Sequence, residues 1–200
     1  MDKNQLINHL REEGFSEKIL DAFFNVKRED FIFEEYKKSA YEDIPLPIGL
    51  GQTISQPYTI AFMLGLLEIE NKDNLKILEI GSGSGYVLAL INEISKNSKI
   101  YGIERIKELA EKSMKVLKDY KNIKVIYGNG SKGLKEEAPF DRILVSASAE
   151  KLPENLYSQL KDNGIMVCVV ENSIFQIKRN GLNINKKEYP GFVFVLLVED

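Results

Sequence analysis

Three alternating glycines follow a short apolar run and mark the part of the chain that could bind a ligand. Residues 75–80 read Leu-Lys-Ile-Leu-Glu-Ile, a pattern typical of a buried parallel strand. Gly81, Gly83 and Gly85 come next, and apolar residues at helical spacing follow over residues 86–96. A strand, a glycine turn and a helix open a nucleotide-binding βαβ unit, in which glycine allows a tight turn and a close approach of backbone to ligand.

Charge and spacing around this turn narrow the choice of ligand. The dinucleotide fingerprint needs glycine at its sixth position, which is Tyr86 here, and no lysine follows as in a phosphate loop. Glu79 precedes the turn, where an acid would repel a pyrophosphate but suit the ammonium and sulfonium of S-adenosylmethionine (SAM). Glu104 ends the next apolar run, about twenty residues on, where a carboxylate can accept hydrogen bonds from both ribose hydroxyls. The alternative is that both acids are solvated strand ends.

Composition limits the remaining classes of function. The chain has 200 residues, of which 44% are hydrophobic, so we expect one globular domain with a substantial core. A net charge of −3 with scattered basic residues argues against a nucleic-acid partner. No apolar run approaches the roughly eighteen residues of a membrane span, and the N-terminus lacks a signal-peptide core. We therefore expect no membrane association and a cytoplasmic location.

The chain has one cysteine and one histidine, which limits metal binding and nucleophilic catalysis. Cys168 is the single cysteine and lies in an apolar run, which favours a buried core residue over a nucleophile. His9 is the single histidine and lies in a polar N-terminal segment. We therefore expect no metal site and no Ser-His-Asp or Cys-His site.

The hydrophobic pattern alternates strands with helices, which predicts a mostly parallel sheet. The predicted helices cover residues 4–13, 17–26, 56–69, 86–96, 107–120 and 154–160, and the predicted strands cover 75–80, 99–104, 123–127, 142–146 and 165–170. Three further strand-like segments, 173–178, 182–187 and 192–198, follow in the tail, with a hairpin turn at 179–181. A turn-rich segment occupies 31–51.

These elements predict an α/β fold with a doubly wound, Rossmann-like sheet; its assignment to the SAM-dependent methyltransferase type depends on the family resemblance given next. Two N-terminal helices would lie over the site, and antiparallel strands would complete the sheet at the C-terminal end. We expect a single domain over residues 1–200, with an N-terminal helical and lid segment (1–55) and a SAM-binding core (56–200).

Several blocks of the sequence resemble the protein-L-isoaspartate O-methyltransferase family. Residues 41–49 read Tyr-Glu-Asp-Ile-Pro-Leu-Pro-Ile-Gly, and residues 51–58 read Gly-Gln-Thr-Ile-Ser-Gln-Pro-Tyr. The glycine turn with its strand (78–86) and the blocks 101–105 and 138–143 also match. Many SAM enzymes share the glycine turn, whereas the Gln-Thr-Ile-Ser-Gln-Pro block is much more particular to this family.

The resemblance implies a SAM-dependent protein-L-isoaspartate (D-aspartate) O-methyltransferase with S-adenosyl-L-homocysteine as the product. Its partners would be damaged proteins or peptides that contain isoaspartate, and we expect it to act as a monomer. Methyl transfer to a carboxylate needs neither a general base nor a general acid, which agrees with a sequence that has a single histidine. A carboxylate is ionised at neutral pH, so it needs no general base, and the sulfonium is already a good leaving group. Catalysis would then come from positioning and exclusion of water.

The resemblance also assigns site residues. Ser55 would lie near the accepting carboxylate and orient it, although its place before Pro57 also suits a helix N-cap. Thr53 and Ile54 would line the cleft towards the cofactor. The other predicted cofactor-binding residues follow the ends of the strands: Glu79, Gly81, Ser82, Gly83, Ser84, Gly85, Glu104, Arg105, Asn129 and Gly130.

Two departures from the family pattern keep other functions open. Asn129 stands where the family has an aspartate that accepts a hydrogen bond from the adenine amino group. Its amide oxygen can still accept this bond, but it lacks the negative charge that strengthens such a bond. The region after Gly164 is also divergent and short. The alternatives are a carboxyl methyltransferase for another peptide acceptor and a catalytically weak SAM-binding recognition module.

Overall fold

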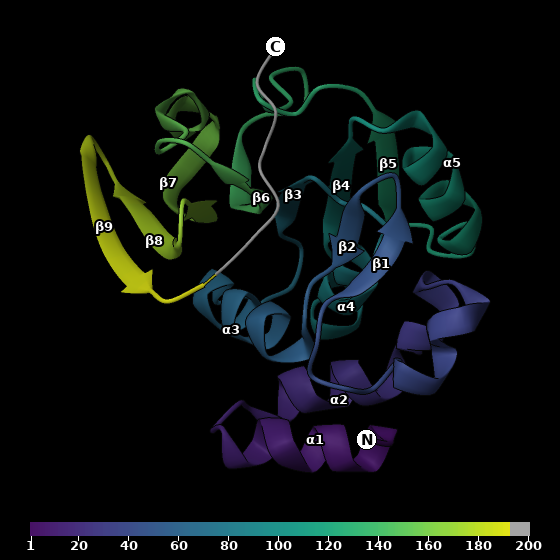
Figure 1. Ribbon diagram of the computed structural model, residues 1–200. Coiled ribbons are helices and arrows are strands. Elements are labelled where there is room, and N and C mark those ends of the chain that lie inside the picture. The colour runs from purple at the N-terminus through teal and green to yellow at the C-terminus, as the bar shows by residue number, and fades with distance from the viewer. Residues whose placement is uncertain (193–200) are drawn as a thin grey trace.

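A seven-stranded sheet forms the centre of the computed structural model, which describes residues 1–192 (Figure 1). The strand order is β5-β4-β3-β6-β7-β8-β9; the first five strands in this order are parallel, and β8 and β9 are antiparallel. The strands are β3 Lys76–Ile80, β4 Lys99–Glu104, β5 Ile123–Tyr127, β6 Phe140–Ala149, β7 Leu160–Val170, β8 Ser173–Asn180 and β9 Asn183–Pro190. This arrangement confirms the predicted α/β sheet with antiparallel strands at its C-terminal end.

The two faces of the sheet are covered differently. Ile77 of β3 faces a large core shared with the helices α3 Pro57–Leu67, α4 Tyr86–Ile94 and α5 Lys107–Val116. Leu78 faces a second core, which the segment 128–139 and the 3-10 helix η3 Glu154–Gln159 complete. The α-helix predicted over 154–160 is therefore wrong in type, because β7 begins at once and leaves only a short 3-10 segment. No helix within residues 1–192 has the length and apolar character needed to cross a membrane.

The N-terminal helices pack behind the helical layer of the sheet. Helix α1 (Lys3–Glu12) packs on α2 (Glu17–Asn25), and α2 packs on α4 and α3, as Figure 1 shows. The predicted turn-rich segment contains two 3-10 helices, η1 (Arg28–Phe31) and η2 (Glu34–Ser39), and a hairpin of β1 (Leu46–Gly49) and β2 (Gln52–Ile54). We expected the two helices over the site, but this hairpin is the part that reaches the glycine turn.

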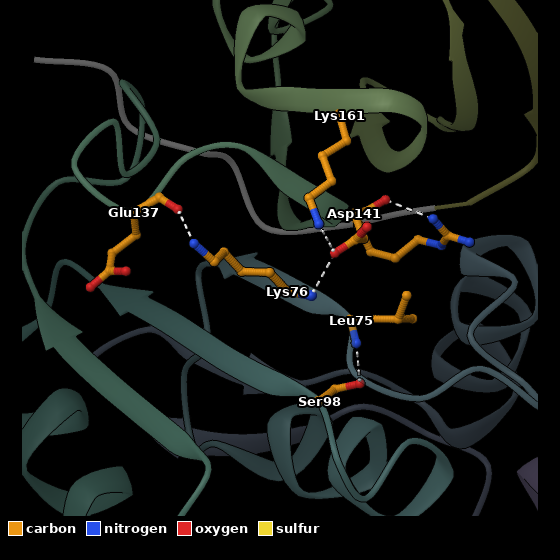
Figure 2. Close-up of polar contacts among 7 residues, drawn as sticks. Leu75, Lys76, Ser98, Glu137, Asp141 and Lys161 are labelled. Atoms are coloured by element: carbon orange, nitrogen blue, oxygen red, sulfur yellow. Dashed lines mark hydrogen bonds and ion pairs between the residues drawn. The ribbon is translucent and has the colours of Figure 1, made fainter.

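Asp141 of β6 connects the amino ends of β3, β6 and β7 by hydrogen bonds and an ion pair (Figure 2). Its Oδ2 atom accepts a 2.7 Å hydrogen bond from the backbone N–H of Lys76 in β3 and pairs at 2.8 Å with Nζ of Lys161 in β7. Beside it, the N–H of Leu75 donates to Oγ of Ser98, just before β4. The block 138–143, which contributed to the resemblance, therefore holds the strands in register at the edge opposite their carboxyl ends.

The described part of the tail forms the predicted antiparallel hairpin. Asn180 of β8 pairs with Asn183 of β9, so Gly181 and Leu182 form a two-residue turn. The third strand predicted over 192–198 lies outside the described residues after Phe192.

Candidate active site

The glycine turn between β3 and α4 has a backbone that other residues adopt with difficulty. The φ angles of Gly81, Gly83 and Gly85 are all positive, at 79°, 52° and 86°. A Cβ atom on Gly85 would also lie 2.7 Å from Cδ1 of Leu117. Glycine is therefore required by conformation at these positions and, at Gly85, also by the packing of α4 against the residue after α5.

Hydrogen bonds tie this turn to the end of β4. The N–H groups of Gly81 and Ser82 both donate to the carbonyl oxygen of Ile103, at 2.9 and 3.1 Å. The N–H of Gly83 donates to Oε2 of Glu104 at 2.8 Å. Because these donors are satisfied within the protein, the turn is not arranged as a phosphate cradle, which agrees with the exclusion of a pyrophosphate made from the sequence.

Glu104 is buried and organises the junction between β4 and α5. Its Oε1 accepts a 2.8 Å hydrogen bond from the N–H of Ile106, and its Oε2 accepts the bond from Gly83. Only 5% of the residue is exposed. A carboxylate has about four acceptor positions, so two remain for ribose hydroxyls. Arg105, the next residue, is exposed at the same edge.

Glu79 carries an unpaired carboxylate oxygen inside the protein. Its Oε1 accepts a 2.7 Å hydrogen bond from Oγ of Ser146 on β6, whereas Oε2 has no partner among residues 1–192. Burial raises the pKa of Glu79 to about 8; the nearby charge of Glu104 adds to this, and the bond from Ser146 opposes it. The hydroxyl of Ser82 is likewise buried without a partner in the described residues. A ligand with a cationic amino group would restore the missing contacts, so these residues fit SAM.

Asn129 and Gly130 follow the carboxyl end of β5, which lies next to β4 on the side away from β3. Gly130 is buried, and a Cβ there would lie 2.6 Å from Cγ2 of Ile80, so only glycine allows this loop to pack on β3. Asn129 is exposed, and its Oδ1 accepts a 2.8 Å hydrogen bond from the N–H of Ser131. Asn129 and Gly130 therefore lie at the carboxyl edge of the sheet, with the Asn129 amide oxygen held by its own loop, and their predicted contact with adenine stays a prediction.

The hairpin of β1 and β2 contacts the glycine turn directly. Cδ1 of Ile48 lies 3.2 Å from the position that a Cβ on Gly83 would take. On the paired strand, Thr53 is exposed and Ile54 is only 4% exposed, with its side chain in the main core. Thr53 can therefore offer its side chain to a ligand, whereas Ile54 can offer only its backbone.

Ser55 connects this hairpin to α3 and does not cap the helix. The N-cap is Gln56, whose side chain makes no capping bond, and Oδ1 of Asp43 accepts a 2.7 Å bond from the N–H of Tyr58 instead. The capping role considered for Ser55 from the sequence is therefore wrong. Ser55 is half-buried, and its hydroxyl makes no hydrogen bond within residues 1–192. It is available for a ligand.

The sequence predictions missed three residues that shape the site. Ser146 had a usable signal, because it ends a predicted strand beside the strand that carries Glu79. Asp43 lies in the block 41–49 that carries the resemblance, but nothing there indicated its contact with Tyr58, and Arg28 had no signal, because these partners lie 15 and 27 residues further along the chain. Cys168, by contrast, is fully buried as predicted, and burial raises the pKa of its thiol to about 12. No cluster of side chains suited to a metal ion occurs in the described part of the chain.

The fold and the site place the chain among the SAM-dependent α/β methyltransferases. Residues 1–200 match the family described as protein-L-isoaspartate(D-aspartate) O-methyltransferase (PCMT), and the chain belongs to this family. It is 41% identical to the protein-L-isoaspartate O-methyltransferase of Ignicoccus hospitalis over 208 residues, covering 99% of this chain and 98% of that protein. It is 46% identical to the enzyme of Fervidobacterium nodosum over 197 residues, covering 95% and 98%.

A solved structure supports the same assignment. It comes from Plasmodium falciparum, is described as a beta-aspartate methyltransferase of this family, and contains S-adenosyl-L-homocysteine. It is 28% identical, matches with a TM-score of 0.84, and covers 100% of both chains. The resemblance found in the sequence blocks is therefore confirmed over the whole chain.

Proposed function

We propose that this protein transfers the methyl group of SAM to the carboxylate of L-isoaspartyl residues in damaged proteins or peptides. The observation that carries the proposal is the placement of the Gln-Thr-Ile-Ser block. The hairpin lies on the glycine turn, and the hydroxyl of Ser55 is left without a partner within residues 1–192. The hairpin that ends at Ser55 thus lies against the glycine turn at the carboxyl edge of the sheet, where open α/β sheets bind their ligands, and this supports a role for the Ser55 hydroxyl beside the cofactor.

The acids at the strand ends are suited to hold the cofactor. Oε2 of Glu79 would meet the amino group of SAM, and Glu104 would accept from the ribose hydroxyls. Asn129 would face the adenine. The other proposed contacts come from the turn and its neighbours: Thr53, Ile54 through its backbone, Gly81, Ser82, Gly83, Ser84, Gly85, Arg105 and Gly130. When bound, SAM supplies an electrophilic methyl group on a sulfonium.

The protein's own part in the reaction is orientation. The accepting carboxylate is already ionised at neutral pH, so no side chain has to remove a proton. The hydroxyl of Ser55 would donate a hydrogen bond to one carboxylate oxygen and leave the other directed at the methyl group. The hairpin over the glycine turn would exclude water from the reacting atoms. We also propose that the chain acts as a monomer, as one domain with residues 1–55 as helical and lid segment, and in the cytoplasm.

Methyl transfer to a matched pair of peptides tests this function. One peptide contains L-isoaspartate, and its twin contains aspartate at the same position. We expect transfer of labelled methyl groups to the isoaspartyl peptide alone. Transfer to the aspartyl twin would indicate a different acceptor. Binding of S-adenosylhomocysteine by calorimetry without any transfer would support a recognition module and contradict the proposal.

A further inference from the structure

Arg28 is the largest fully buried side chain of the molecule's described part, and it lies beneath the Ser55 loop. It is 0% exposed and sits at the start of η1. Its Nη1 donates to the carbonyl oxygens of Ala40 and Glu42, at 2.9 and 3.2 Å. Its Nη2 donates to the carbonyl oxygens of Ile44 and Ser55, both at 3.0 Å.

These four bonds join two separate segments of backbone. Three acceptors belong to residues 40–44, which precede β1, and the fourth is Ser55, which follows β2. Each terminal nitrogen donates two hydrogen bonds, so a displacement of either segment would break at least one of the four. Burial lowers the pKa of Arg28, with Tyr86, Asp43 and Tyr41 opposing the shift, but a guanidinium remains charged at any working pH.

Asp43 holds the other side of the same loop. Besides the bond from Tyr58, its carboxylate lies 3.5 Å from Nε2 of Gln56. Asp43 belongs to the segment 40–44, whose carbonyl oxygens accept hydrogen bonds from Arg28. Both residues therefore stabilise the backbone around Ser55. Ser55 is thus fixed through its own carbonyl by Arg28 and through the following residues by Asp43.

We infer that Arg28, together with Asp43, is a positioning residue that sets the place of the Ser55 hydroxyl for methyl transfer. The inference rests on the proposed function, because it assigns Ser55 to the reaction. Neither Arg28 nor Asp43 needs to touch the substrate. Each determines where the backbone carries Ser55, and a displacement of about 1 Å at such a group can cost roughly 100-fold in rate.

The forked shape of arginine is what the site requires. Nη2 reaches one carbonyl on each segment, and Nη1 holds two further carbonyls of residues 40–44. The single ammonium of lysine could satisfy only some of these four carbonyls. Arg28→Lys therefore keeps the charge but cannot keep all four bonds. Arg142→Lys is the matched control, because Arg142 is also a buried arginine that donates to backbone carbonyls, those of Leu67, Glu68 and Asp141.

The two variants are compared in three measurements. For Arg28→Lys we expect kcat/KM for the isoaspartyl peptide to fall about 30-fold or more, mainly through kcat. The Kd for S-adenosylhomocysteine should change less than about threefold, because the acids that hold it lie on β3 and β4. Hydrogen exchange of a peptide over residues 52–58 should accelerate. Arg142→Lys should lower the melting temperature but change kcat/KM and the exchange of 52–58 less than about threefold.

A second pair of variants keeps the test valid if Arg28→Lys does not fold. Asp43→Ala removes the cap of α3, and Asp2→Ala removes the cap of α1, where Oδ1 of Asp2 accepts from the N–H of Gln5 at 2.9 Å. Both lose one helix cap, but only Asp43→Ala should reduce kcat about tenfold or more and loosen residues 52–58. Equal effects within either pair would overturn the inference. If the wild type methylates no isoaspartyl peptide, the proposed function fails, while the exchange data still decide whether these residues hold the loop.

Discussion

At pH 8, Glu79→Gln is expected to stabilise the free protein while weakening its binding of the cofactor. Glutamine keeps an oxygen that can accept the hydrogen bond from Ser146, and it resembles a protonated carboxyl in shape. It cannot take up a negative charge opposite an ammonium. The substitution therefore separates two effects of the Glu79 carboxylate: the lowering of the free energy of unfolding by a buried charge, and the gain in affinity for the cofactor.

The size of the effect follows from the pKa of Glu79. The pKa is about 8 in the folded chain, against an ordinary value of 4.5. Between these values the folded chain retains a proton that the unfolded chain has lost, so stability decreases as pH rises through this window. The full difference corresponds to about 5 kcal/mol above pH 8. The unpaired amide of glutamine also has a desolvation cost, so we expect Glu79→Gln to gain about 2 kcal/mol at pH 8.

Urea denaturation at two pH values measures this difference. The free energy of unfolding of Glu79→Gln should exceed that of the wild type by about 2 kcal/mol at pH 8. At pH 5, where the wild-type carboxyl is protonated in the folded chain, the order should reverse, with the variant less stable by about 1.5 kcal/mol. Calorimetry at pH 7 in two buffers of different ionisation enthalpy should show that S-adenosylhomocysteine displaces up to about one proton from the wild type and none from the variant. The variant should bind about tenfold more weakly. A stability gap that does not depend on pH, or binding without proton release, would refute the reasoning.

Three further substitutions test other parts of the site and the fold. Ser55→Ala should lower kcat/KM about 30-fold and shift the free energy of unfolding by less than about 0.5 kcal/mol, because Asp43 caps α3; a large loss of stability with full activity would contradict the assignment. Asn129→Asp should tighten the Kd for S-adenosylhomocysteine about tenfold by calorimetry, and unchanged or weaker binding would exclude a charge-strengthened adenine contact. Asp141→Ala should cost about 2 kcal/mol in urea denaturation, because it removes the partner of Lys76 and Lys161, with kcat/KM unchanged; an effect on kcat/KM would give Asp141 a role beyond the fold.

The sheet and the cofactor loop could be predicted because their signals are local. A parallel strand buried on both faces appears as an apolar run, and the glycines at 81, 83 and 85 follow one such run immediately. The structure gives all three a positive φ, so the residue types report a backbone conformation directly. The prediction of an α-helix at 154–160 was wrong because the local pattern does not show how closely β7 follows. Its apolar residues contribute to the second core, but only six residues separate Pro153 from β7, and they form a 3-10 helix.

The support of Ser55 could not be predicted, because it depends on contacts between distant parts of the chain. A serine before Gln-Pro and an apolar helix has the sequence of an N-cap. Asp43 takes that role from fifteen residues away, and Arg28 reaches Ser55 from twenty-seven residues away. Neither contact has a period or a motif. Only the folded hairpin shows that the hydroxyl is uncommitted within the described residues.

The two edges of the sheet satisfy their polar groups in opposite ways. At the amino edge, Asp141 meets a backbone N–H and a lysine, and this part of the fold is complete without a ligand. At the carboxyl edge, Oε2 of Glu79 and Oγ of Ser82 are buried without partners among residues 1–192. Such groups destabilise a free protein, and a ligand that supplies their partners stabilises the fold by the same interactions through which it binds. The unpaired atoms at the carboxyl edge thus belong to a site whose hydrogen bonds are completed by the cofactor.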